Sequence, residues 1–408
     1  MNRAVIAGAV LTAGLVSGGM LIQSGAWREA GAATGSARLL DQVMARIGQD
    51  YIDSVSTDDM YRRAASGFVK EIDDPYSTLL TPERFRRLRE TTTGRYAGVG
   101  IELDMRDGFV TVIAPLAGTP ADSAGIKPGD RIATVDGKPI IGLSMEDVQQ
   151  ALRGAAGTKV RLTVERGPDK PSFTLTRRMI VYHPVQRAEL VSGTAFVELA
   201  TFSERAASEL RRTIDSLRAR GALSLILDLR ENPGGLLEQG IAVADLFLNE
   251  GETIASTRGR TPDADHEFED DAPQLWPGMP IVALVDSGTA SAAEIVAGAL
   301  QDNKRAVLVG SRTYGKGSAQ SIFPVTGGSA LKLTTARWFT PDGKTIQRDS
   351  TTGGIVPDVV VNREEAAKAN APVVFRIPAL DPVVQRAVDL LHGVSTPEQL
   401  SARLPRRK

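Results

Sequence analysis

Three short, predominantly apolar segments in the second half of the chain constrain its fold more than any other feature. They are Leu223–Leu229, Ile281–Val285 and Val307–Val309. Segments with helical periodicity alternate with them, namely Phe202–Arg220, Gly240–Leu248 and Ala292–Gln301. This alternation of buried strands and helices is the pattern of an α/β core. The sequence therefore predicts an α/β domain from about residue 181. Its functional groups are expected at the ends of the buried strands, where open α/β sheets place their sites.

Composition narrows the chemistry that this domain can perform. The 408 residues include no cysteine and only three histidines. Disulfides, thiolate metal sites and thiol nucleophiles are therefore excluded. Lys and Arg number 48 against 49 Asp and Glu, and this balance argues against a nucleic-acid partner, which requires a clustered excess of positive charge. Catalysis would have to use mostly Ser, Thr, Lys, Asp, Glu and backbone groups.

The N-terminal part of the chain divides into two segments. Residues 1–27 place Arg3 ahead of an uncharged, apolar run, which is typical of an export signal. That run is also long enough to span a bilayer, so cleavage and retention as a membrane anchor both stay open, as does a buried N-terminal helix. Residues 38–93 are expected to be helical, and Thr81 followed by Pro82 should begin the last helix of this region.

Residues 94–168 change to the period of two that β-strands show. A short helix is expected to start at Ser144, where Asp147 supplies the second residue of a capping box. The order of these elements and the run Ala124–Asp130 resemble a PDZ domain. The resemblance implies a groove that binds a peptide as an added strand and holds its terminal carboxylate with backbone N–H groups. The matching carboxylate loop is formed by Gly98, Val99, Gly100 and Ile101.

Two of the predicted strand ends carry candidate functional groups. Asn232-Pro233-Gly234-Gly235 follows the first strand, and paired glycines let backbone N–H groups point at an incoming oxygen, as an oxyanion hole requires. Ser291 follows the second strand, at or near a helix start. Serine is a preferred N-cap residue. A serine at such a turn can also be a nucleophile, because the helix dipole and free N–H groups stabilise negative charge there. Spacing alone leaves both interpretations open.

The third strand end leads into Gly310–Gln320, which contains Lys316. This segment nearly matches a phosphate-binding loop. However, Gly317 stands where a hydroxyl should bind magnesium, and a strand rather than a helix is expected to follow. The other interpretations of Lys316 are a solvated turn lysine and a general base whose pKa is lowered by burial.

No histidine offers a better base than Lys316. His183 precedes a proline at a domain junction, and His392 lies near the C-terminus. His266 lies in an acidic stretch, residues 261–273, which is expected to form an exposed loop. Lysine is therefore favoured by elimination.

Several motifs in the same order resemble the carboxy-terminal processing proteases, or tail-specific proteases, of the S41 serine peptidase family. These motifs are Asn232–Gly235, Gly288–Ile295 with Ala297–Asp302, Tyr314–Gln320, Pro341–Gln347 and Gly354–Asp358. By motif, the resemblance implies that Ser291 is the nucleophile, Lys316 the general base and Gln320 the residue that orients the lysine. It implies an oxyanion hole formed by the N–H groups of Ala292 and of Gly234 or Gly235.

The family resemblance also implies an architecture and a function. A crotonase-like or ClpP-like α/β protease core, residues 181–360, would follow the PDZ domain and precede a helical tail, residues 361–408. The chain would be a serine endopeptidase that cleaves exported polypeptides near or from their free C-terminal tails, without metal or cofactor. It would act in the periplasm or cell envelope, or anchored in the inner membrane.

The family allows two further partners, and two rival functions stay open. A homo-oligomer could form through the terminal helices, at residues 38–90 and 381–391, and an adaptor lipoprotein could deliver the protease. The first rival is a non-catalytic PDZ adaptor on an inactive protease fold. The second is a nucleotide hydrolase that uses Gly310–Gly317.

Overall fold

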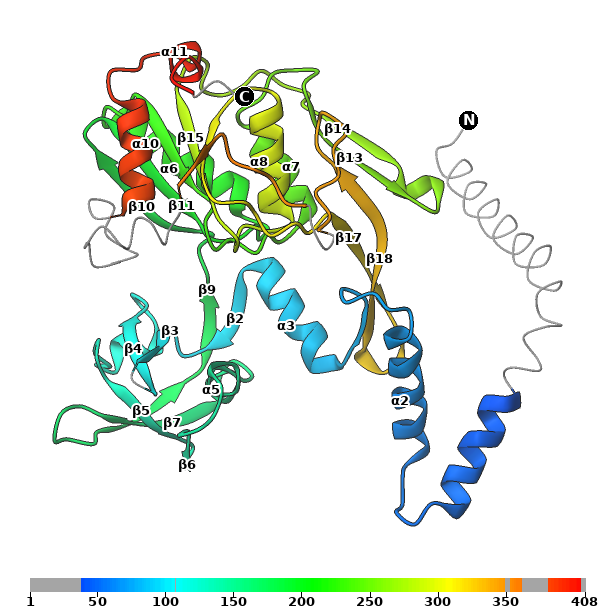
Figure 1. Cartoon of the computed structure of the whole chain (residues 1–408). Coiled ribbons are helices and arrows are strands. Elements are labelled where there is room, and N and C mark those ends of the chain that lie inside the picture. Colours follow the sequence, from blue (N-terminus) through cyan, green and yellow to red (C-terminus); the bar gives the residue numbers. More distant parts are fainter. Residues whose placement is uncertain (1–37, 107, 349–352, 362–380, 405–408) are drawn as a thin grey trace, which may run out of the picture. The chain divides into compact units, whose positions relative to one another are not determined.

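The structure is a computed structural model (Figure 1), and it describes residues 38–106, 108–348, 353–361 and 381–404. The chain divides into two compact units, residues 1–79 and 80–408. The predicted export segment, residues 1–27, and residues 362–380 of the predicted tail lie outside the described residues. Among the residues that are described, no helix is both long and apolar enough to cross a membrane.

The first unit contains two described helices. One spans residues 38–50 and the other, α2, spans Thr57–Lys70. The Ser56 hydroxyl accepts a hydrogen bond from the Asp59 N–H (3.1 Å) and so caps α2. The side chains that indicated the first helix by their spacing are exposed; they include Leu39, Val43 and Ile47.

The strand β1 (Thr78–Leu80) and the helix α3 (Pro82–Thr93) follow. The Thr81 hydroxyl accepts a hydrogen bond from the Arg84 N–H (3.3 Å), and Pro82 occupies the first helical position, so the predicted start of this helix is confirmed.

A small sheet domain comes next in the chain. Its strands run in the order β3-β4-β5-β7-β8, with β6 beside β5. It has its own apolar core, which includes Val112, Val148 and Leu162. Ser144 and Asp147 form the capping box that was predicted for α5. The elements are β3 (Ile101–Arg106), β4 (Phe109–Pro115), α4 (Pro120–Ser123), β5 (Arg131–Val135), β6 (Lys138–Pro139), α5 (Met145–Leu152), β7 (Lys159–Glu165) and β8 (Ser172–Thr176). An antiparallel ribbon of β2 (Arg95–Gly98) and β9 (Arg178–Val181) flanks this domain in sequence.

The larger domain is built on a six-stranded sheet with the order β10-β11-β12-β15-β16-β19. The edge strand β10 is antiparallel to its neighbour, and the other pairs are parallel. The strands are β10 (Val185–Val191), β11 (Thr194–Leu199), β12 (Ser224–Asp228), β15 (Ile281–Val285), β16 (Val307–Gly310) and β19 (Val359–Val360). The helices are α6 (Ala206–Ala219), α7 (Leu237–Asp245), α8 (Ala292–Asp302), α10 (Pro382–Leu391) and α11 (Pro397–Ser401).

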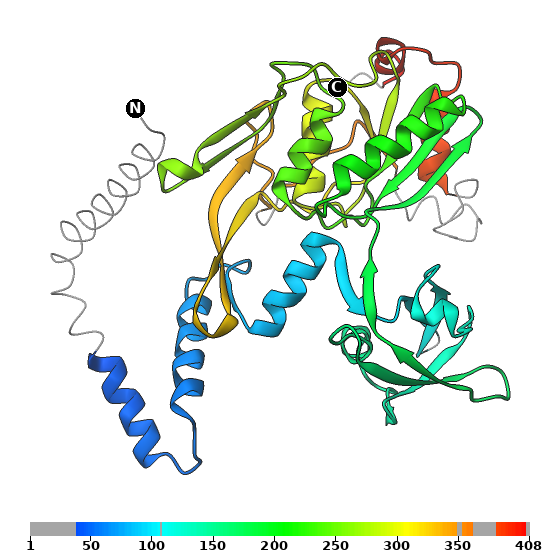
Figure 2. The ribbon, with the colours of Figure 1, turned by 180° about the vertical axis from the view of Figure 1, so that it is seen from behind.

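Alternate residues of the central strands face opposite layers of helices. Leu225 and Leu227 of β12 pack in one core with α6, α7 and α8, whereas Ile226 packs in a second core with α10 and α11. Accordingly, α10 is on the near side of the sheet in Figure 1, and α6 and α7 are on the near side in Figure 2. Burial on both faces explains why these strands are apolar at consecutive positions, and the predicted α/β architecture is confirmed.

A second sheet corrects one prediction. The strands β17 (Ser318–Pro324), β18 (Ala330–Phe339), β13 (Thr253–Gly259) and β14 (His266–Glu269) form it, with short 3₁₀ turns at Pro262–Ala264 and Thr326–Gly328. The prediction that residues 261–273 form only an exposed loop was therefore wrong. His266 pairs with Thr257, and Glu269 pairs with Thr253. The acidic composition of this stretch does not favour a strand, so its strand conformation depends on hydrogen bonding to β13.

Two helix boundaries also differ from the prediction. The helix predicted from Phe202 begins only at Ala206. Phe202 is held out of the helix because its N–H donates to the Gly234 carbonyl (3.0 Å) and its carbonyl accepts from the Leu236 N–H (2.8 Å). The next helix, predicted from Gly240, begins earlier, at Leu237.

A matched pair of leucines tests the sheet core. Leu227 is fully buried, whereas Leu223, just ahead of the same strand, is 78% exposed. We expect Leu227→Ala to lower the free energy of unfolding by about 2–5 kcal/mol, because it opens a cavity in the core. We expect Leu223→Ala to change it by about 0.5 kcal/mol or less. Chemical denaturation of both variants measures the difference, and equal losses would contradict the described core.

Candidate active site

The three segments predicted to carry function meet at one edge of the large sheet. Because β12, β15 and β16 run parallel, their carboxyl ends lie at the same edge. Backbone hydrogen bonds join the turns that follow them. The Ala290 N–H donates to the Asn232 carbonyl (2.9 Å), and the Tyr314 N–H donates to the Thr289 carbonyl (3.0 Å). The sheet thus brings together segments that are far apart in the sequence.

The backbone of Ser291 is strained at the turn into α8. Its φ of 56° and ψ of −119° lie outside the extended region that an N-cap residue normally adopts. The Glu294 N–H donates to the Ser291 carbonyl (2.8 Å), and the Glu294 side chain accepts a hydrogen bond from the Ser291 N–H (2.8 Å). A positive φ at a non-glycine residue costs roughly 1–3 kcal/mol and is concentrated at functional sites. The geometry therefore favours the nucleophile interpretation of Ser291 over the helix-cap interpretation.

The glycine pair lies directly against this turn. Gly234 has a φ of 91°, and a Cβ there would lie 2.9 Å from both the Ala292 nitrogen and the Ser291 Cβ, so only glycine fits. The Gly234 N–H already donates to the Asn232 side-chain oxygen (2.9 Å). Within the described part of the chain, the Gly235 and Ala292 N–H groups donate to no protein acceptor. Of the two glycines left open by the sequence, the hydrogen bonding favours Gly235 as a partner of Ala292.

Glu294 joins the serine segment to the lysine segment. Its side chain is 0% exposed, and each of its two carboxylate oxygens accepts two hydrogen bonds. Oε2 accepts from the Ser291 N–H (2.8 Å) and the Lys316 N–H (2.9 Å). Oε1 accepts from the Thr313 hydroxyl (2.5 Å) and the Gly315 N–H (2.7 Å). One buried carboxylate thus fixes the backbone of both candidate catalytic residues.

Two opposing effects act on the protonation of Glu294. Burial raises the pKa of its carboxyl, whereas the hydrogen bonds from Thr313, Lys316, Gly315 and Ser291 lower it, and burial prevails. All four donors stabilise the charged form.

The lysine segment is held by further contacts. The Lys316 carbonyl accepts a hydrogen bond from the Trp338 indole N–H (2.9 Å), and the Gly317 carbonyl accepts from the Trp338 backbone N–H (3.0 Å). Burial lowers the pKa of the half-buried Lys316 ammonium, and the positive charge of Lys332 lowers it further, while Glu294 raises it. A lysine with a lowered pKa is better suited to accept a proton than a solvated turn lysine.

The amide nitrogen of Gln320 donates to residues other than Lys316. The Gln320 side-chain nitrogen donates to the Ser318 carbonyl (3.1 Å) and hydroxyl (2.9 Å) and to the Thr334 hydroxyl (3.3 Å). Gln320 lies in β17, which directly follows the lysine segment. That strand is also where a phosphate-binding loop would require a helix, so the nucleotide interpretation of Lys316 loses support.

The histidines contact residues outside the glycine, serine and lysine segments. The His183 Nδ1 lies 3.0 Å from the Glu209 carboxylate, and the His266 Nε2 lies 2.8 Å from the Asp263 carbonyl. His392 ends α10.

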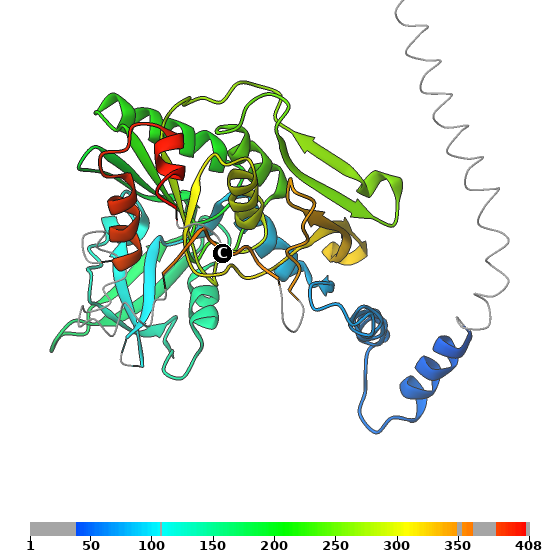
Figure 3. The same ribbon diagram turned by 45° about the horizontal axis from the view of Figure 1, so that its top comes forward.

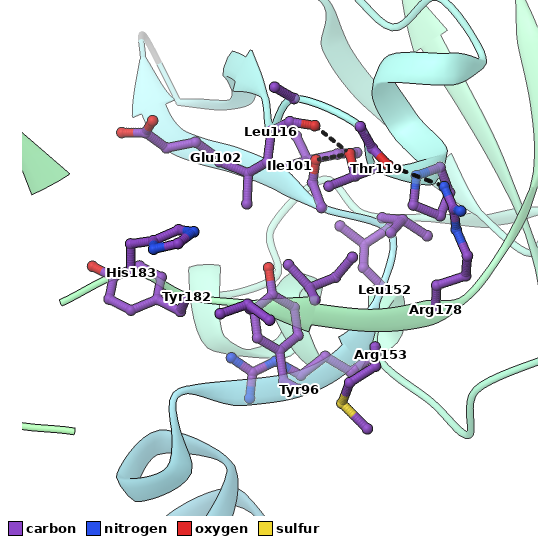
Figure 4. Close-up of a pocket in the computed structure, with 18 of the residues that line it drawn as sticks. Tyr96, Ile101, Glu102, Leu116, Thr119, Leu152, Arg153, Arg178, Tyr182 and His183 are labelled. Atoms are coloured by element: carbon purple, nitrogen blue, oxygen red, sulfur yellow. Dashed lines mark hydrogen bonds between the residues drawn. The ribbon is translucent and has the colours of Figure 1, made fainter. Parts of the chain in front are cut away.

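The small sheet domain contains a groove that includes most of the predicted carboxylate loop. A cavity of about 760 Å³ is lined by Val99, Gly100 and Ile101, and also by Leu152, the last residue of α5, and by Arg153, which follows it (Figure 4). The fourth predicted residue, Gly98, belongs to β2 and does not line the cavity. Beside the cavity, β3 is the edge strand of its sheet, so its outer edge is open to an added strand.

The loop backbone leaves two donors unused. The Val99 and Gly100 carbonyls accept hydrogen bonds from Ala121 and Leu116 (3.0 Å each), whereas within the described residues their N–H groups donate to no protein acceptor. Gly100 has a φ of 75°, and a Cβ there would lie 2.4 Å from the Thr119 Cβ, so glycine is required.

An α/β domain with a strained serine at a strand end, linked to a domain with a peptide-sized groove, has the architecture of a serine peptidase that carries a PDZ domain. Comparison with known proteins agrees. Residues 193–361 match the model of peptidase family S41, and residues 111–166 match that of the PDZ domain. An S41 protease structure from Bacteroides fragilis covers 86% of this chain and 97% of its own at a TM-score of 0.55 and 18% identity, which supports the fold alone.

Curated relatives are more informative. The carboxy-terminal-processing protease of Bartonella bacilliformis is 37% identical over 79% of this chain and 74% of its own length. The carboxyl-terminal-processing protease of Synechocystis is 35% identical over 92% of this chain and 91% of its own length. The chain therefore belongs to peptidase family S41, among the carboxy-terminal processing proteases, and is a serine-type peptidase with a PDZ domain. The family resemblance of the sequence is confirmed.

No role for Glu294 was predicted from the sequence, although this residue lies within one of the family motifs. The sequence does contain a signal for one contact of Glu294. A Ser-x-x-Glu spacing at a helix start predicts that the glutamate side chain accepts a hydrogen bond from the serine N–H. The other donors to Glu294 come from residues 313–316, and no local pattern connects those residues to a glutamate in α8.

We expect Glu294→Gln to lower the free energy of unfolding by about 2–5 kcal/mol, because an amide nitrogen replaces one acceptor oxygen and leaves two buried donors without partners. The exposed Glu238, in the first turn of α7, provides the control, and Glu238→Gln should change stability little. Denaturation curves measure both effects. Hydrogen exchange should also quicken at residues 313–316 in Glu294→Gln alone. Unchanged exchange there would contradict the clamping role.

Proposed function

We propose that this protein is a serine endopeptidase that cleaves polypeptides near or from their free C-terminal tails, with Ser291 as nucleophile and Lys316 as general base. The observation that carries the proposal is the Glu294 carboxylate, whose Oε2 bonds to the backbone N–H groups of both residues. The relatives named above as carboxy-terminal processing proteases support the choice of substrate.

The proposed reaction has two steps, and in each step Lys316 accepts one proton and returns it. Neutral Lys316 accepts the proton of the Ser291 hydroxyl while the oxygen attacks the scissile carbonyl, and the lysine then protonates the departing amine. The acyl-enzyme that remains is cleaved by water, with Lys316 again accepting and returning a proton. The negative charge on the carbonyl oxygen is stabilised by the N–H groups of Ala292 and Gly235, which donate to no acceptor among the described residues.

Gln320 orients Lys316 in this proposal through its amide oxygen, because the lysine amine donates and needs an acceptor. The amide nitrogen of Gln320 donates to Ser318 and Thr334, and these contacts would fix the orientation of the amide.

The PDZ groove captures the substrate tail in this proposal. A C-terminal peptide would add to the open edge of β3, and its carboxylate would accept hydrogen bonds from the N–H groups of Val99 and Gly100. Arg153 and Arg178 line the same cavity and add positive charge near an anionic terminus. Apolar side chains that include Leu116, Leu152 and Ile180 also line the cavity, which suits an apolar tail.

A location and an assembly are also part of the proposal, and the sequence is their main support. The apolar segment in residues 1–27 supports export to the periplasm or cell envelope, with the segment either cleaved or kept as an inner-membrane anchor. The exposed apolar side chains of the first unit, Leu39, Val43 and Ile47, support a homo-oligomer through the terminal helices. An adaptor lipoprotein stays a prediction from the family.

Substitution of the serine is the direct test of the proposal. We expect Ser291→Ala to abolish cleavage of an unfolded substrate that ends in a free apolar tail. Lys316→Arg should do the same, because a guanidinium does not lose its proton. The control is Ser287→Ala, at an exposed serine in the same turn, and it should cleave at the wild-type rate. A substrate with an amidated tail should be cleaved more slowly if the groove binds the carboxylate.

The outcomes of this experiment separate the alternatives. Wild-type cleavage by Ser291→Ala would refute the nucleophile. If neither the wild type nor any variant cleaves while tail peptides still bind, the adaptor interpretation would replace the proposal.

The pH dependence tests the lysine. Activity should rise with pH as Lys316 loses its proton. The positive charge of Lys332 helps to lower the pKa of Lys316. Lys332→Met should therefore raise that pKa, move the rising limb of the kcat/KM profile to higher pH and reduce activity at neutral pH. The control Lys344→Met removes an exposed lysine that is paired with Asp342 (2.7 Å) and should leave the limb in place. Coincident profiles for both variants and wild type would remove Lys316 as the titrating base.

A further inference from the structure

Three carboxylates gather on the protease core outside the candidate active site. Asp245 is the last residue of α7, and Asp270 and Asp271 directly follow β14, at the base of the hairpin of β13 and β14 (Figure 3). Each residue brings one oxygen to within 4.8 Å of the other two. The Asp270 backbone is fixed by two hydrogen bonds, because its N–H donates to the Glu252 carbonyl (3.0 Å) and its carbonyl accepts from the Gly251 N–H (2.9 Å).

Asp270 is the unusual member of this group. Its side chain is 2% exposed. Its Oδ1 accepts a hydrogen bond from the Ala272 N–H (2.9 Å), but its Oδ2 is buried and receives none. A buried carboxylate oxygen without a donor is costly and requires a cation or a proton.

We propose that Asp245, Asp270 and Asp271 bind a divalent cation of the calcium type. The site is distinct from the proposed catalytic groups, and the inference does not depend on the proposed function. The alternative occupant of the same site is a proton shared between the carboxylates of Asp245 and Asp270.

The ligand chemistry favours calcium among divalent cations. All three side chains offer oxygen, and Ca²⁺ binds oxygen at about 2.3–2.6 Å, so ligands on opposite sides of one ion are up to about 5 Å apart. The spacing of the three oxygens, within 4.8 Å, fits around one such ion. Mg²⁺ needs shorter bonds and a near-ideal octahedron, which three carboxylates on two separate segments are less suited to supply.

The surroundings also suit a cation. Asp245 ends a helix, and the negative end of a helix dipole favours positive charge. Asp271 is exposed, so an ion can enter from solvent and water can complete its coordination. Bound there, the ion would fasten the end of α7 to the base of the β13–β14 hairpin. The same helix starts directly after the glycine pair of the oxyanion segment.

The test measures binding of calcium itself to the purified chain after chelator treatment. We expect isothermal titration with CaCl2 to show one site. We also expect millimolar Ca²⁺ to raise the melting temperature by about 2–4 °C. Asp270→Asn should abolish both responses, and its metal-free melting temperature should equal or exceed that of wild type because a like charge is removed. Asp271→Asn, at an exposed position, should weaken binding about tenfold even if Asp270→Asn fails to fold.

Glu267→Gln is the matched control, because it removes an exposed charge from the same hairpin but outside the three carboxylates. It should bind calcium like wild type. Absence of binding by wild type at 10 mM Ca²⁺ would overturn the proposal in favour of a shared proton. Equal binding by Asp270→Asn, equal loss in Glu267→Gln, or an equal response to Mg²⁺ would overturn it as well.

Discussion

The buried carboxylate of Glu294 is the interaction on which the geometry of the candidate active site depends. An isolated charge at a fully buried position would be strongly destabilising. Here four donors compensate it, and they come from both sides of the site, the serine turn and the lysine segment. Because hydrogen bonds to a charged group are strong and directional, the same contacts that make the buried charge tolerable also hold the two segments together.

The parallel sheet makes that contact possible. The turns after β12, β15 and β16 emerge at one edge, so the glycine pair, the serine and the lysine become neighbours although they are spread over residues 234–316. The strained backbone of Ser291 is tolerated because the surrounding structure fixes it. Helix α8 holds it on one side, and Gly234 approaches it closely on the other.

Features that depend on a few neighbouring residues were predictable from the sequence, whereas features that depend on tertiary contacts were not. The capping box of Ser144 and Asp147 and the start of α3 at Thr81 need only a few neighbouring residues, and both were predicted. The strand β15, apolar at every position, was predicted to the residue. The strand β14 was missed, because its acidic sequence becomes a strand only by pairing with β13. For the same reason, no pattern placed Thr313 on Glu294 or turned Gln320 toward Thr334.

Glu294 and Asp270, two of the buried carboxylates of the protease core, show why partners matter more than burial. Glu294 and Asp270 are similarly hidden from solvent, and burial is the leading cause that raises the pKa of each. Glu294 faces four donors, whereas Asp270 faces one donor and two further carboxylates. The first environment is complete as it stands and gives the carboxylate a positioning role. In the second, Oδ2 of Asp270 has no donor and two further carboxylates lie nearby, and this lack of positive charge is the basis of the proposal that the three carboxylates bind a cation.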